Sequence, residues 1–447
     1  MKPETKIAFW VSAGRIAGRL RPRRRTVTPW PPRETPAGIS VVIPSRNGKD
    51  LLAAQMPGIV RELERFPAEI VVVDNGSDDG TGDWLRSAWA QVQLETSPAP
   101  LSFARAVNRG IRRARYSHVC LLNNDMIIAQ NFFAALVRAF EQVPDLFCAT
   151  AQILFPEGVR REETGKAVYF QPGPADFPIR CDEPLPGEDL TWVLYGSGGC
   201  SLYDAAMLRA LGSLDPAYDP AYVEDLDIGY RAWQRGWPTV YVAGAVLEHR
   251  HRATSSRYYT GEQLEEILEI NYLRFLARAV ASSGVFRTLW EQALHRLCLR
   301  AAAADVPRKA LRAAPWIALS GGPGYLADYS EELLLALGSG AIAVFPGGVP
   351  PADPRAVIAS TGIGRQTRQG VVLVALSERL EPPPAAVLSQ CAEVVVVRRS
   401  GGSLAFRAAL QQTVRKWQPE VAYLDGPDMA QYAADCAPAR ALTRPPS

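Results

Sequence analysis

Two groups of acidic side chains, roughly a hundred residues apart, are the places in this sequence where chemistry can be done. Glu224, Asp225 and Asp227 place three carboxylates within four positions, and an Asn-Asn-Asp segment at 123–125 ends an apolar run. Carboxylates held this close repel one another, so a fold gathers them where a cation or a proton transfer requires them. The two groups therefore predict an enzyme that handles a metal-bound, phosphorylated substrate.

The acidic group at 224–227 exceeds what the start of a helix requires. One acid is enough to cap a helix, and Asp227 is placed to anchor the helix or to pair with Arg231. The surplus acids predict a general base, with Asp225 or Glu224 in that role.

Asp125 is the predicted ligand of a divalent cation, with the amides of Asn123 and Asn124 beside it. Mg²⁺ or Mn²⁺ bound to a diphosphate needs one or two protein carboxylates, because phosphates and waters complete its shell. A structural alternative stays open, in which Asp125 is the N-cap of a helix over 127–140.

Two of the four histidines, His249 and His251, follow a predicted strand over 239–248. A neutral imidazole can complete a metal shell, so one of the pair is expected near the cation. Arg250, Arg252 and Arg257 make the same segment a candidate clamp for phosphate or for a nucleotide leaving group.

The elements that must position these residues alternate from residue 38 onwards. Expected strands cover 39–44, 69–74, 92–95 and 118–122, and expected helices cover 51–66, 81–90 and 102–115. This order predicts an α/β fold with a mostly parallel sheet flanked by helices, whose ligands bind beyond the carboxyl ends of the strands. Pro44, Asp74 and Asp125 stand at such ends, and Asp74 can accept hydrogen bonds from a base or a ribose.

Composition sets the domain limits and excludes some partners. Residues 1–38 carry nine Lys or Arg against Glu4 and Glu34, which leaves the rest of the 447 residues at a net charge of about −4. The body is therefore not expected to bind nucleic acid. The basic, Pro-rich tail either lies on an anionic membrane surface or is a disordered extension. Further expected parts are a catalytic domain at 39–280, a helical extension at 281–330, a Gly/Pro-rich linker with ordered pieces at 331–369, and an α/β segment at 370–447.

The cysteines and the apolar segments indicate the compartment. Seven cysteines occur without a Cys-x-x-Cys pair, which predicts free thiols in a reducing, cytoplasmic environment and no zinc site. No run of about 18 apolar residues occurs, so no membrane-spanning helix is expected. A peripheral position at the inner face of the cell membrane, through the basic tail, remains compatible with this.

An ordered set of motifs over residues 39 to about 280 resembles the family 2 glycosyltransferases. The similar segments are Ile43-Pro44-Ser45-Arg46-Asn47, 73–81, 108–111, 121–125, 195–199 and 224–227. The resemblance implies a GT-A fold and an inverting single displacement. A UDP- or dTDP-linked sugar is the favoured donor, and a hydroxyl of a cell-surface glycan or glycolipid is the implied acceptor.

The resemblance also implies a role for individual residues. Pro44, Arg46 and Asp74 would hold the nucleoside, with help from Asn108 and Arg109.

In the second half of the domain, Gly198 would contact the nucleotide-sugar and Asp225 would accept the proton of the acceptor hydroxyl. Residues 123–125 would occupy the Asp-x-Asp position, with Asn123 and Asn124 contacting the nucleotide-sugar and Asp125 as the principal ligand of Mn²⁺ or Mg²⁺. His249 or His251 matches a histidine that is frequent in the family. Asn123 departs from the pattern, because it replaces the first acid of the motif and removes one negative charge.

Two rival functions and one further resemblance complete the expectations. The segment 370–447 is similar, more loosely, to the opening half of the amino-terminal domain of GT-B glycosyltransferases, without a donor-binding half. A catalytically silent nucleotide-sugar-binding module is the first alternative function. A nucleotidyltransferase is the second, although its glycine-rich first loop is replaced here by residues 44–47.

Overall fold

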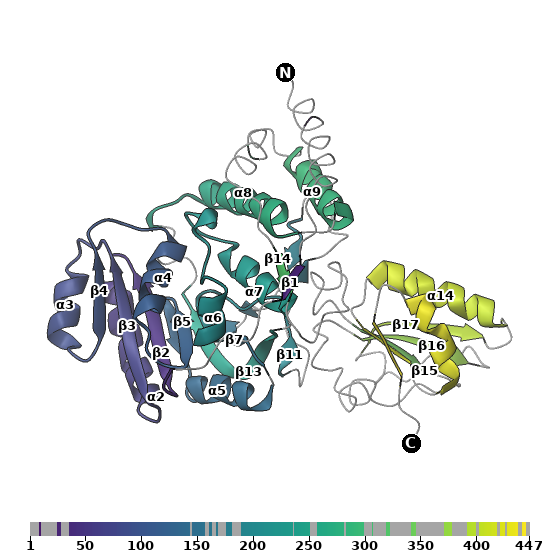
Figure 1. The fold of residues 1–447 in the computed structure, drawn as a ribbon, viewed down its shortest axis with the longest axis horizontal. Coiled ribbons are helices and arrows are strands. Elements are labelled where there is room, and N and C mark those ends of the chain that lie inside the picture. Colours follow the sequence, from purple (N-terminus) through teal and green to yellow (C-terminus); the bar gives the residue numbers. More distant parts are fainter. Residues whose placement is uncertain are drawn as a thin grey trace. The chain divides into compact units, whose positions relative to one another are not determined.

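The computed structural model describes residues 35–156 apart from 144, residues 189–298 apart from 236, 251–256 and 281–282, and shorter pieces of the remaining chain. The chain divides into two compact units (Figure 1). The first comprises Met1–Thr164, Pro172–Phe177 and Tyr195–Ala327, and the second comprises Gly165–Gln171, Pro178–Leu194 and Asp328–Ser447. All described candidate residues of the active site belong to the first unit.

The first unit is built on a mixed sheet with the strand order β13-β7-β12-β5-β2-β3-β4. The strands are β2 (Ile39–Ser45), β3 (Ala68–Asn75), β4 (Gln93–Ser97), β5 (His118–Leu122), β7 (Cys148–Leu154), β12 (Cys200–Asp204) and β13 (Thr239–His249). Strands β4, β3, β2 and β5 are parallel, whereas β12 is antiparallel to both β5 and β7. The predicted mostly parallel sheet is thereby confirmed, and β12 is its antiparallel member.

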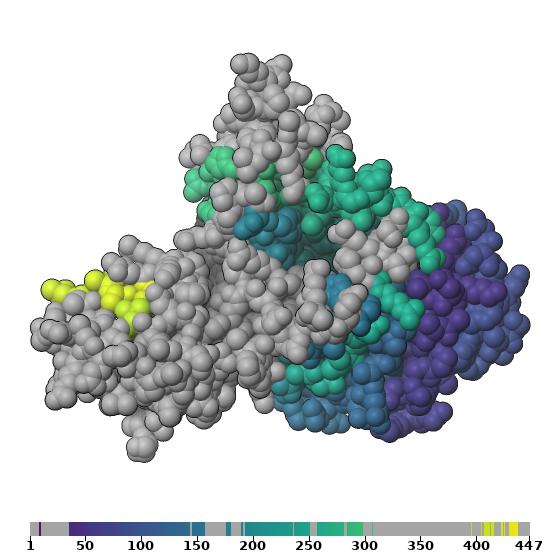
Figure 2. Space-filling view, turned by 180° about the vertical axis from the view of Figure 1, so that it is seen from behind, coloured from purple at the N-terminus to yellow at the C-terminus, as the bar shows by residue number. Residues whose placement is uncertain are grey.

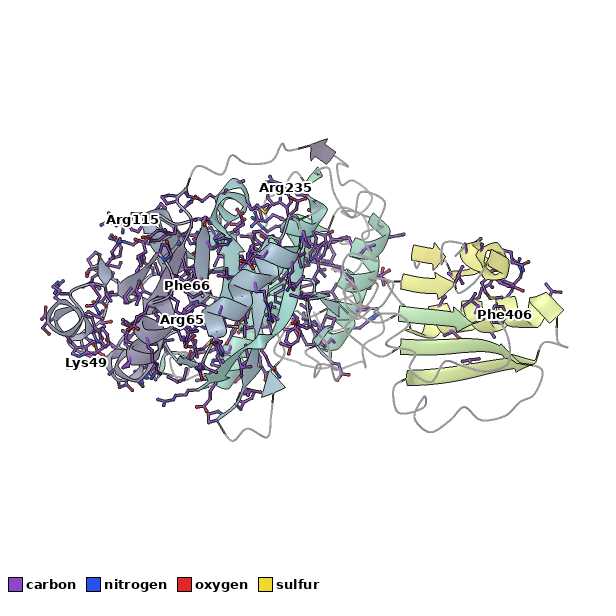
Figure 3. The ribbon with its side chains drawn as sticks, turned by 90° about the horizontal axis from the view of Figure 1, so that it is seen from below. Lys49, Arg65, Phe66, Arg115, Arg235 and Phe406 are labelled. Carbon is purple, nitrogen blue, oxygen red and sulfur yellow. The ribbon has the colours of Figure 1, made fainter. Side chains whose placement is uncertain are left out.

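Helices flank this sheet, and the described side chains fill the space between them (Figure 3). The helices of this unit are α2 (Lys49–Leu63), α3 (Thr81–Ala88), α4 (Phe103–Arg113), α5 (Phe132–Gln142), α6 (Ala205–Ala210), α7 (Glu224–Gln234), α8 (Gly261–Ala279), α9 (Ser283–Cys298) and the short η1 (Pro216–Tyr218). A Cβ on Gly110 would lie 2.3 Å from Val42 Cγ1, so the backbone of α4 lies directly on β2. Among the described helices, none combines the length and the apolar character needed to cross a membrane.

The segment after Asp125 differs from the expected helix over 127–140. Met126–Ile128 forms a strand, β6, that pairs antiparallel with β13, and α5 begins only at Phe132 after the N-cap Asn131. Asp125 is therefore not the N-cap of a helix. Strand β13 supplies the partner that an apolar run of three residues needs in order to become a strand.

Smaller strands complete the first unit. Arg25–Val27, within the expected tail, forms β1 and pairs with β14 (Leu319–Gly321). A two-residue strand, β8 (Arg161–Glu162), pairs with β7. Residues of the first unit from β2 to α5, coloured purple to blue, form a continuous surface in the space-filling view (Figure 2).

The second unit is a small parallel sheet with the order β17-β16-β15-β18-β19. Its strands are β15 (Ala341–Phe345), β16 (Val371–Ser377), β17 (Cys391–Arg398), β18 (Val421–Leu424) and β19 (Arg440–Thr443), and the short β9 (Ala167–Val168), β10 (Ile179–Arg180) and β11 (Thr191–Trp192) also belong to this unit. Phe406 and Leu410 of α14 (Gly402–Trp417) pack with Tyr432 of η6 (Pro427–Cys436) in its core (Figure 3). The central strand β15 lies inside the expected linker at 331–369.

Candidate active site

The turn that carries Asp125 is held from two sides. Asn123 N donates to the carbonyl of Gly199 (2.8 Å) at the start of β12. From α2, the buried Gln55 donates through Nε2 to the carbonyls of Asn123 (2.6 Å) and Met126 (2.7 Å). These bonds span the turn at both ends, so the direction of the Asp125 side chain is set by α2 and β12 together. No sequence motif marks Gln55.

Asp125 and His249 meet because β6 and β13 pair. The pairing places His249 opposite Met126, and Arg250 N donates to the carbonyl of Asp125 (2.9 Å). His249 Nε2 lies 3.7 Å from Asp125 Oδ1. The predicted neighbourhood of these two side chains is present, whereas His251 and Arg252 lie outside the described residues.

This pair fits the requirements of a divalent cation. Asp125 is buried, and its Oδ1 has no hydrogen-bond partner among the described residues, which leaves an anionic oxygen ready for a ligand. In the described part of the chain no group of three or more His, Cys, Asp or Glu side chains forms a metal site. A carboxylate and an imidazole without a third protein ligand suit a cation whose remaining ligands come from a diphosphate and from water.

Asn124 and Asn123 contact the protein rather than open space. Asn124 Nδ2 donates to Ser45 Oγ (2.9 Å) at the end of β2. A Cβ placed on Gly199 would lie 2.4 Å from Asn123 Nδ2, so the Asn123 side chain packs against this glycine. Their predicted contacts with a nucleotide-sugar stay predictions.

The loops after β2 and β3 are joined into one structure. Asn47 N donates to Ser77 Oγ (2.9 Å), and Asp78 N donates to Asn47 Oδ1 (2.8 Å). At the end of β3, the buried Asp74 accepts from Ser77 N (3.2 Å) through Oδ1. The sequence predicted that strand ends would assemble a nucleoside site, and the structure places Asp74 and residues 44–47 at one sheet edge, because β2 and β3 pair from Ile39 to Ser45.

Arg46 is covered by the segment that follows β13. Its guanidinium lies 3.8 Å from the centre of the Tyr258 ring, and Arg46 Nε has no hydrogen-bond partner among the described residues. Arg257 donates to the carbonyl of Asn47 and to Asp50 Oδ2 (3.2 Å). The loop with the predicted nucleoside residues and the arginine-rich segment are thus neighbours.

Asn108 and Arg109 of α4 have contacts of their own. Asn108 exchanges two hydrogen bonds with the backbone of Leu214 (2.6 and 3.0 Å), and Arg109 Nε pairs with Glu95 (3.1 Å). The structure gives both side chains a structural task. Their expected help in holding the nucleoside stays a prediction without a supporting contact.

The acidic group at the start of α7 divides into three environments. Asp225 accepts from Leu226 N (2.8 Å) and from Gly198 N (3.3 Å). Asp227 accepts from Tyr218 Oη (2.9 Å) and Arg231 Nε (2.7 Å), which confirms its expected anchoring role. Glu224 is buried, and its Oε2 has no partner among the described residues.

The surroundings of Glu224 determine its protonation. Burial, followed by the negative charge of Asp225, raises the pKa of the Glu224 carboxyl well above its ordinary value. A carboxyl group with a raised pKa holds its proton to a higher pH than an ordinary glutamate does. The two neighbouring acids, which the sequence left as alternatives for the base, therefore differ in their surroundings.

The backbone before α7 is strained and held from α8. Tyr222 and Val223 have φ angles of 72° and 77°, a region that a β-branched residue rarely adopts. Asn271 donates through Nδ2 to the carbonyls of Tyr218 (2.6 Å), Ala221 (2.8 Å) and Tyr222 (3.1 Å). This buried amide fixes the turn that aims Glu224 and Asp225, and no sequence motif marks it.

A pair of glycines connects the two acidic groups. Gly198 donates to Asp225, and the next residue, Gly199, accepts from the backbone of Asn123. The metal-binding candidates and the base candidates are therefore joined through two adjacent residues, although they are far apart in sequence. This is the juxtaposition that a displacement reaction between a metal-bound leaving group and an acceptor hydroxyl requires.

The model of the glycosyltransferase-like family 2 matches residues 36–266, more than half of the chain. The chain belongs to glycosyltransferase family 2. The predicted family is thereby confirmed, and the first unit has the mostly parallel α/β sheet flanked by helices that the motifs implied.

Curated relatives are similar over parts of the chain. An uncharacterised protein of Sinorhizobium fredii, y4gI, is 24% identical over 260 residues, which are 55% of this chain and 28% of that protein. The N-acetylglucosaminyl-diphospho-decaprenol L-rhamnosyltransferase of Mycobacterium tuberculosis is 27% identical over 228 residues, which are 43% of this chain and 73% of the enzyme.

Solved structures of glycosyltransferases are more distant. GalNAc-T7 with UDP, GalNAc and Mn²⁺ has a TM-score of 0.44 at 18% identity, over 62% of this chain and 56% of that one. The mannosyltransferase PcManGT of Pyrobaculum calidifontis, with GDP-Man and Mn²⁺, has a TM-score of 0.40 at 15% identity, over 70% of this chain and 85% of that one.

Proposed function

We propose that this glycosyltransferase works by inversion and moves a sugar from a nucleotide-diphospho-sugar to a hydroxyl of a glycan or glycolipid. The observation that carries the proposal is the glycine pair that links Asp225 to the Asp125 turn. It brings a candidate base and a candidate cation site together, as a single displacement requires.

Asp125 and His249 would hold a divalent cation, Mn²⁺ or Mg²⁺, which supplies positive charge to the leaving diphosphate when bound. Asp225 accepts the proton of the acceptor hydroxyl. Its two backbone hydrogen bonds orient the carboxylate for that task. Glu224 is not assigned this role, because burial raises the pKa of its carboxyl group and its Oε2 has no partner among the described residues.

The nucleoside is assigned to the edge formed by the ends of β2 and β3. Asp74 there offers a buried carboxylate, and the joined loops 44–47 and 74–78 surround it. A UDP- or dTDP-linked donor is favoured. The rhamnosyltransferase relative carries a lipid-linked N-acetylglucosaminyl diphosphate in its name, which supports a glycolipid acceptor for this protein. A peripheral membrane position through residues 1–38 would suit such an acceptor.

Release of the free nucleotide from sugar nucleotides tests the proposal. A thermal-shift screen of UDP-, dTDP- and GDP-sugars with and without Mn²⁺ selects the donor, because a ligand that binds the native state raises the melting temperature. Nucleotide release from that donor is expected to fall at least about 100-fold in Asp225→Asn. Asp83→Asn, at an exposed position of α3, is the matched control and should leave release unchanged.

Three outcomes would contradict the proposal. Unchanged release in Asp225→Asn would remove the assigned base. Donor binding without any release would indicate the silent module, and pyrophosphate release from a nucleoside triphosphate would indicate a nucleotidyltransferase.

A further inference from the structure

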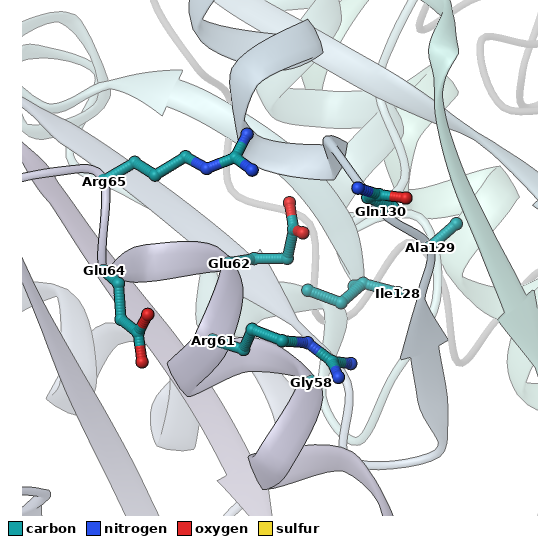
Figure 4. Close-up of a pocket in the computed structure, with 8 residues that line it drawn as sticks. All are labelled: Gly58, Arg61, Glu62, Glu64, Arg65, Ile128, Ala129 and Gln130. Atoms are coloured by element: carbon teal, nitrogen blue, oxygen red, sulfur yellow. The ribbon is translucent and has the colours of Figure 1, made fainter.

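A pocket of about 440 Å³ lies between α2 and the segment after β6, outside the candidate active site. Arg61 and Glu62 line it from the end of α2, Glu64 and Arg65 from the turn that follows, and Ile128 and Gln130 from the other side (Figure 4). Its volume falls within the range of ligand-binding pockets, about 300–1,000 Å³. None of these residues was assigned a function by the sequence motifs or by the proposed transfer.

Glu62 is the residue of this pocket that indicates a ligand. Its side chain projects into the pocket between Arg65, Gln130 and Ile128 (Figure 4). The residue is 8% exposed, yet its carboxyl group makes no hydrogen bond or ion pair with any described residue. Its carboxyl oxygens are not among the buried orphaned atoms, so they are accessible from the pocket and can accept hydrogen bonds from a donor outside the chain.

The charges around the pocket select the class of that ligand. Two guanidinium groups donate hydrogen bonds only, and two carboxylates accept only, so the formal charges of Arg61, Glu62, Glu64 and Arg65 cancel. A phosphate would face Glu62, and a metal cation would face the two arginines. A neutral molecule with many hydroxyls matches both kinds of group, because each hydroxyl donates and accepts.

We propose that this pocket is a second saccharide-binding site, which takes a neutral sugar unit through Glu62, Arg61 and Gln130. It begins where β6 ends: Ile128 is three residues beyond Asp125, about 10 Å along a strand. The pocket lies at the end of β6, and the metal-binding candidate Asp125 lies in the turn before this strand; the pocket uses none of the active-site residues. The proposal depends on the pocket alone and goes beyond the transfer reaction.

Saturation-transfer NMR on the full-length protein tests the site with free sugars as probes: L-rhamnose, D-galactose, D-mannose and N-acetyl-D-glucosamine. At least one sugar should bind. Glu62→Gln and Arg61→Ala should each weaken the affinity for that sugar at least about tenfold, because the loss of one hydrogen bond to a charged group lowers an affinity by about this factor. Glu141→Gln on α5 and Arg112→Ala on α4, both at exposed positions, are the matched controls and should leave the affinity unchanged.

The same measurement in Asp225→Asn separates the two sites. Sugar binding that persists in this variant supports the second site even if the proposed transfer is wrong, whereas binding that disappears places the sugar in the candidate active site and overturns the inference. It is also overturned if none of the four sugars binds, or if Glu62→Gln and Arg61→Ala bind as well as the wild type. The inference is also overturned if inorganic phosphate, Mn²⁺ or glycine binds and this binding depends on Glu62, because the pocket would then take a different class of ligand.

Discussion

Glu224 and Asp225 are adjacent in sequence, but hydrogen bonds reach the two carboxyl groups differently. Asp225 accepts from two backbone N–H groups, whereas Glu224 Oε2 has no partner among the described residues. Hydrogen bonds stabilise a charged carboxylate, and burial without them favours the protonated form. One short acidic motif therefore holds its carboxyl groups in two different environments, which is why counting acids in the sequence could not identify the base.

The raised pKa of Glu224 predicts a pH-dependent stability difference. Because the folded-state pKa lies above the unfolded value near 4.5, the stabilising contribution is complete below that pH and is lost as the pH rises toward the folded pKa. Glu224→Gln has no carboxyl group to titrate at this position, so the variant does not lose this contribution to stability as the pH rises. Its free energy of unfolding relative to the wild type should increase from about pH 5 to pH 8, at up to about 1.4 kcal/mol per pH unit.

Urea unfolding at several pH values measures this difference. Glu141→Gln on the exposed surface of α5 should follow the wild type at every pH. If the curves of Glu224→Gln and the wild type run parallel, the pKa of the Glu224 carboxyl group is not raised in the folded protein.

Asp125→Asn is predicted to weaken metal-dependent nucleotide binding. The substitution keeps an oxygen at the site but removes the charge, so the affinity for UDP in the presence of Mn²⁺ should fall at least about tenfold. Isothermal titration with Mn²⁺ and with EDTA measures the change. In EDTA the wild type and the variant should bind UDP alike, and equal affinities in Mn²⁺ would exclude Asp125 as a ligand. Asp83→Asn on α3 is the matched control.

At the level of elements, the sequence predicted the strands of the parallel core well. Runs such as residues 39–44 and 69–74 are β-branched, continuous and bounded by turn residues, which is typical of strands buried on both faces. Short apolar runs were less certain. Met126–Ile128 became a strand because β13 pairs with it, and Ala341–Phe345 became the centre of a sheet inside an expected linker. In both cases the deciding partner lies far away in the sequence.

The candidate site shows the same division. Asp125, His249 and the acids of α7 could be found because acids and histidines are conspicuous at strand and helix ends. Gln55 and Asn271 could not be found, because a polar residue within a helix resembles any solvent-exposed position. Their hydrogen bonds reach 71 and 53 residues along the chain, and they hold the turns that carry the acids.

The substitution Asn271→Ala tests how α8 supports the turn before α7. The substitution leaves the carbonyls of Tyr218, Ala221 and Tyr222 without this donor, so the free energy of unfolding should fall by about 1–3 kcal/mol. Because Asn271 positions the turn before Glu224, kcat should fall while the affinity for UDP and Mn²⁺ stays within about twofold. Steady-state kinetics and titration separate the two effects.

Gln142→Ala, at an exposed position of α5, is the control for that experiment and should change neither quantity. A variant of Asn271 that lost stability but kept the wild-type kcat would show that the turn is held for folding alone.

For the whole molecule, the division into two units has an energetic consequence. Each unit has an apolar cluster of its own: the first includes Val42, Leu121 and Trp237, and the second is built from α14, β18 and η6. Units with separate cores need not unfold together. The described candidate residues all lie in the first unit, so a ligand of the active site stabilises that unit directly.

Calorimetry of the full-length protein should therefore show two unfolding transitions. UDP with Mn²⁺ should raise the melting temperature of the first unit. At a ligand concentration 100 times Kd, the free energy of unfolding of this unit should increase by about 2.7 kcal/mol. Leu410→Ala truncates a fully buried side chain in the core of the second unit. The free energy of unfolding of that unit should fall by about 2–5 kcal/mol, and its melting temperature should fall with it. One transition that responds to both the ligand and Leu410→Ala would contradict this division, because the two cores would then form a single cooperative unit.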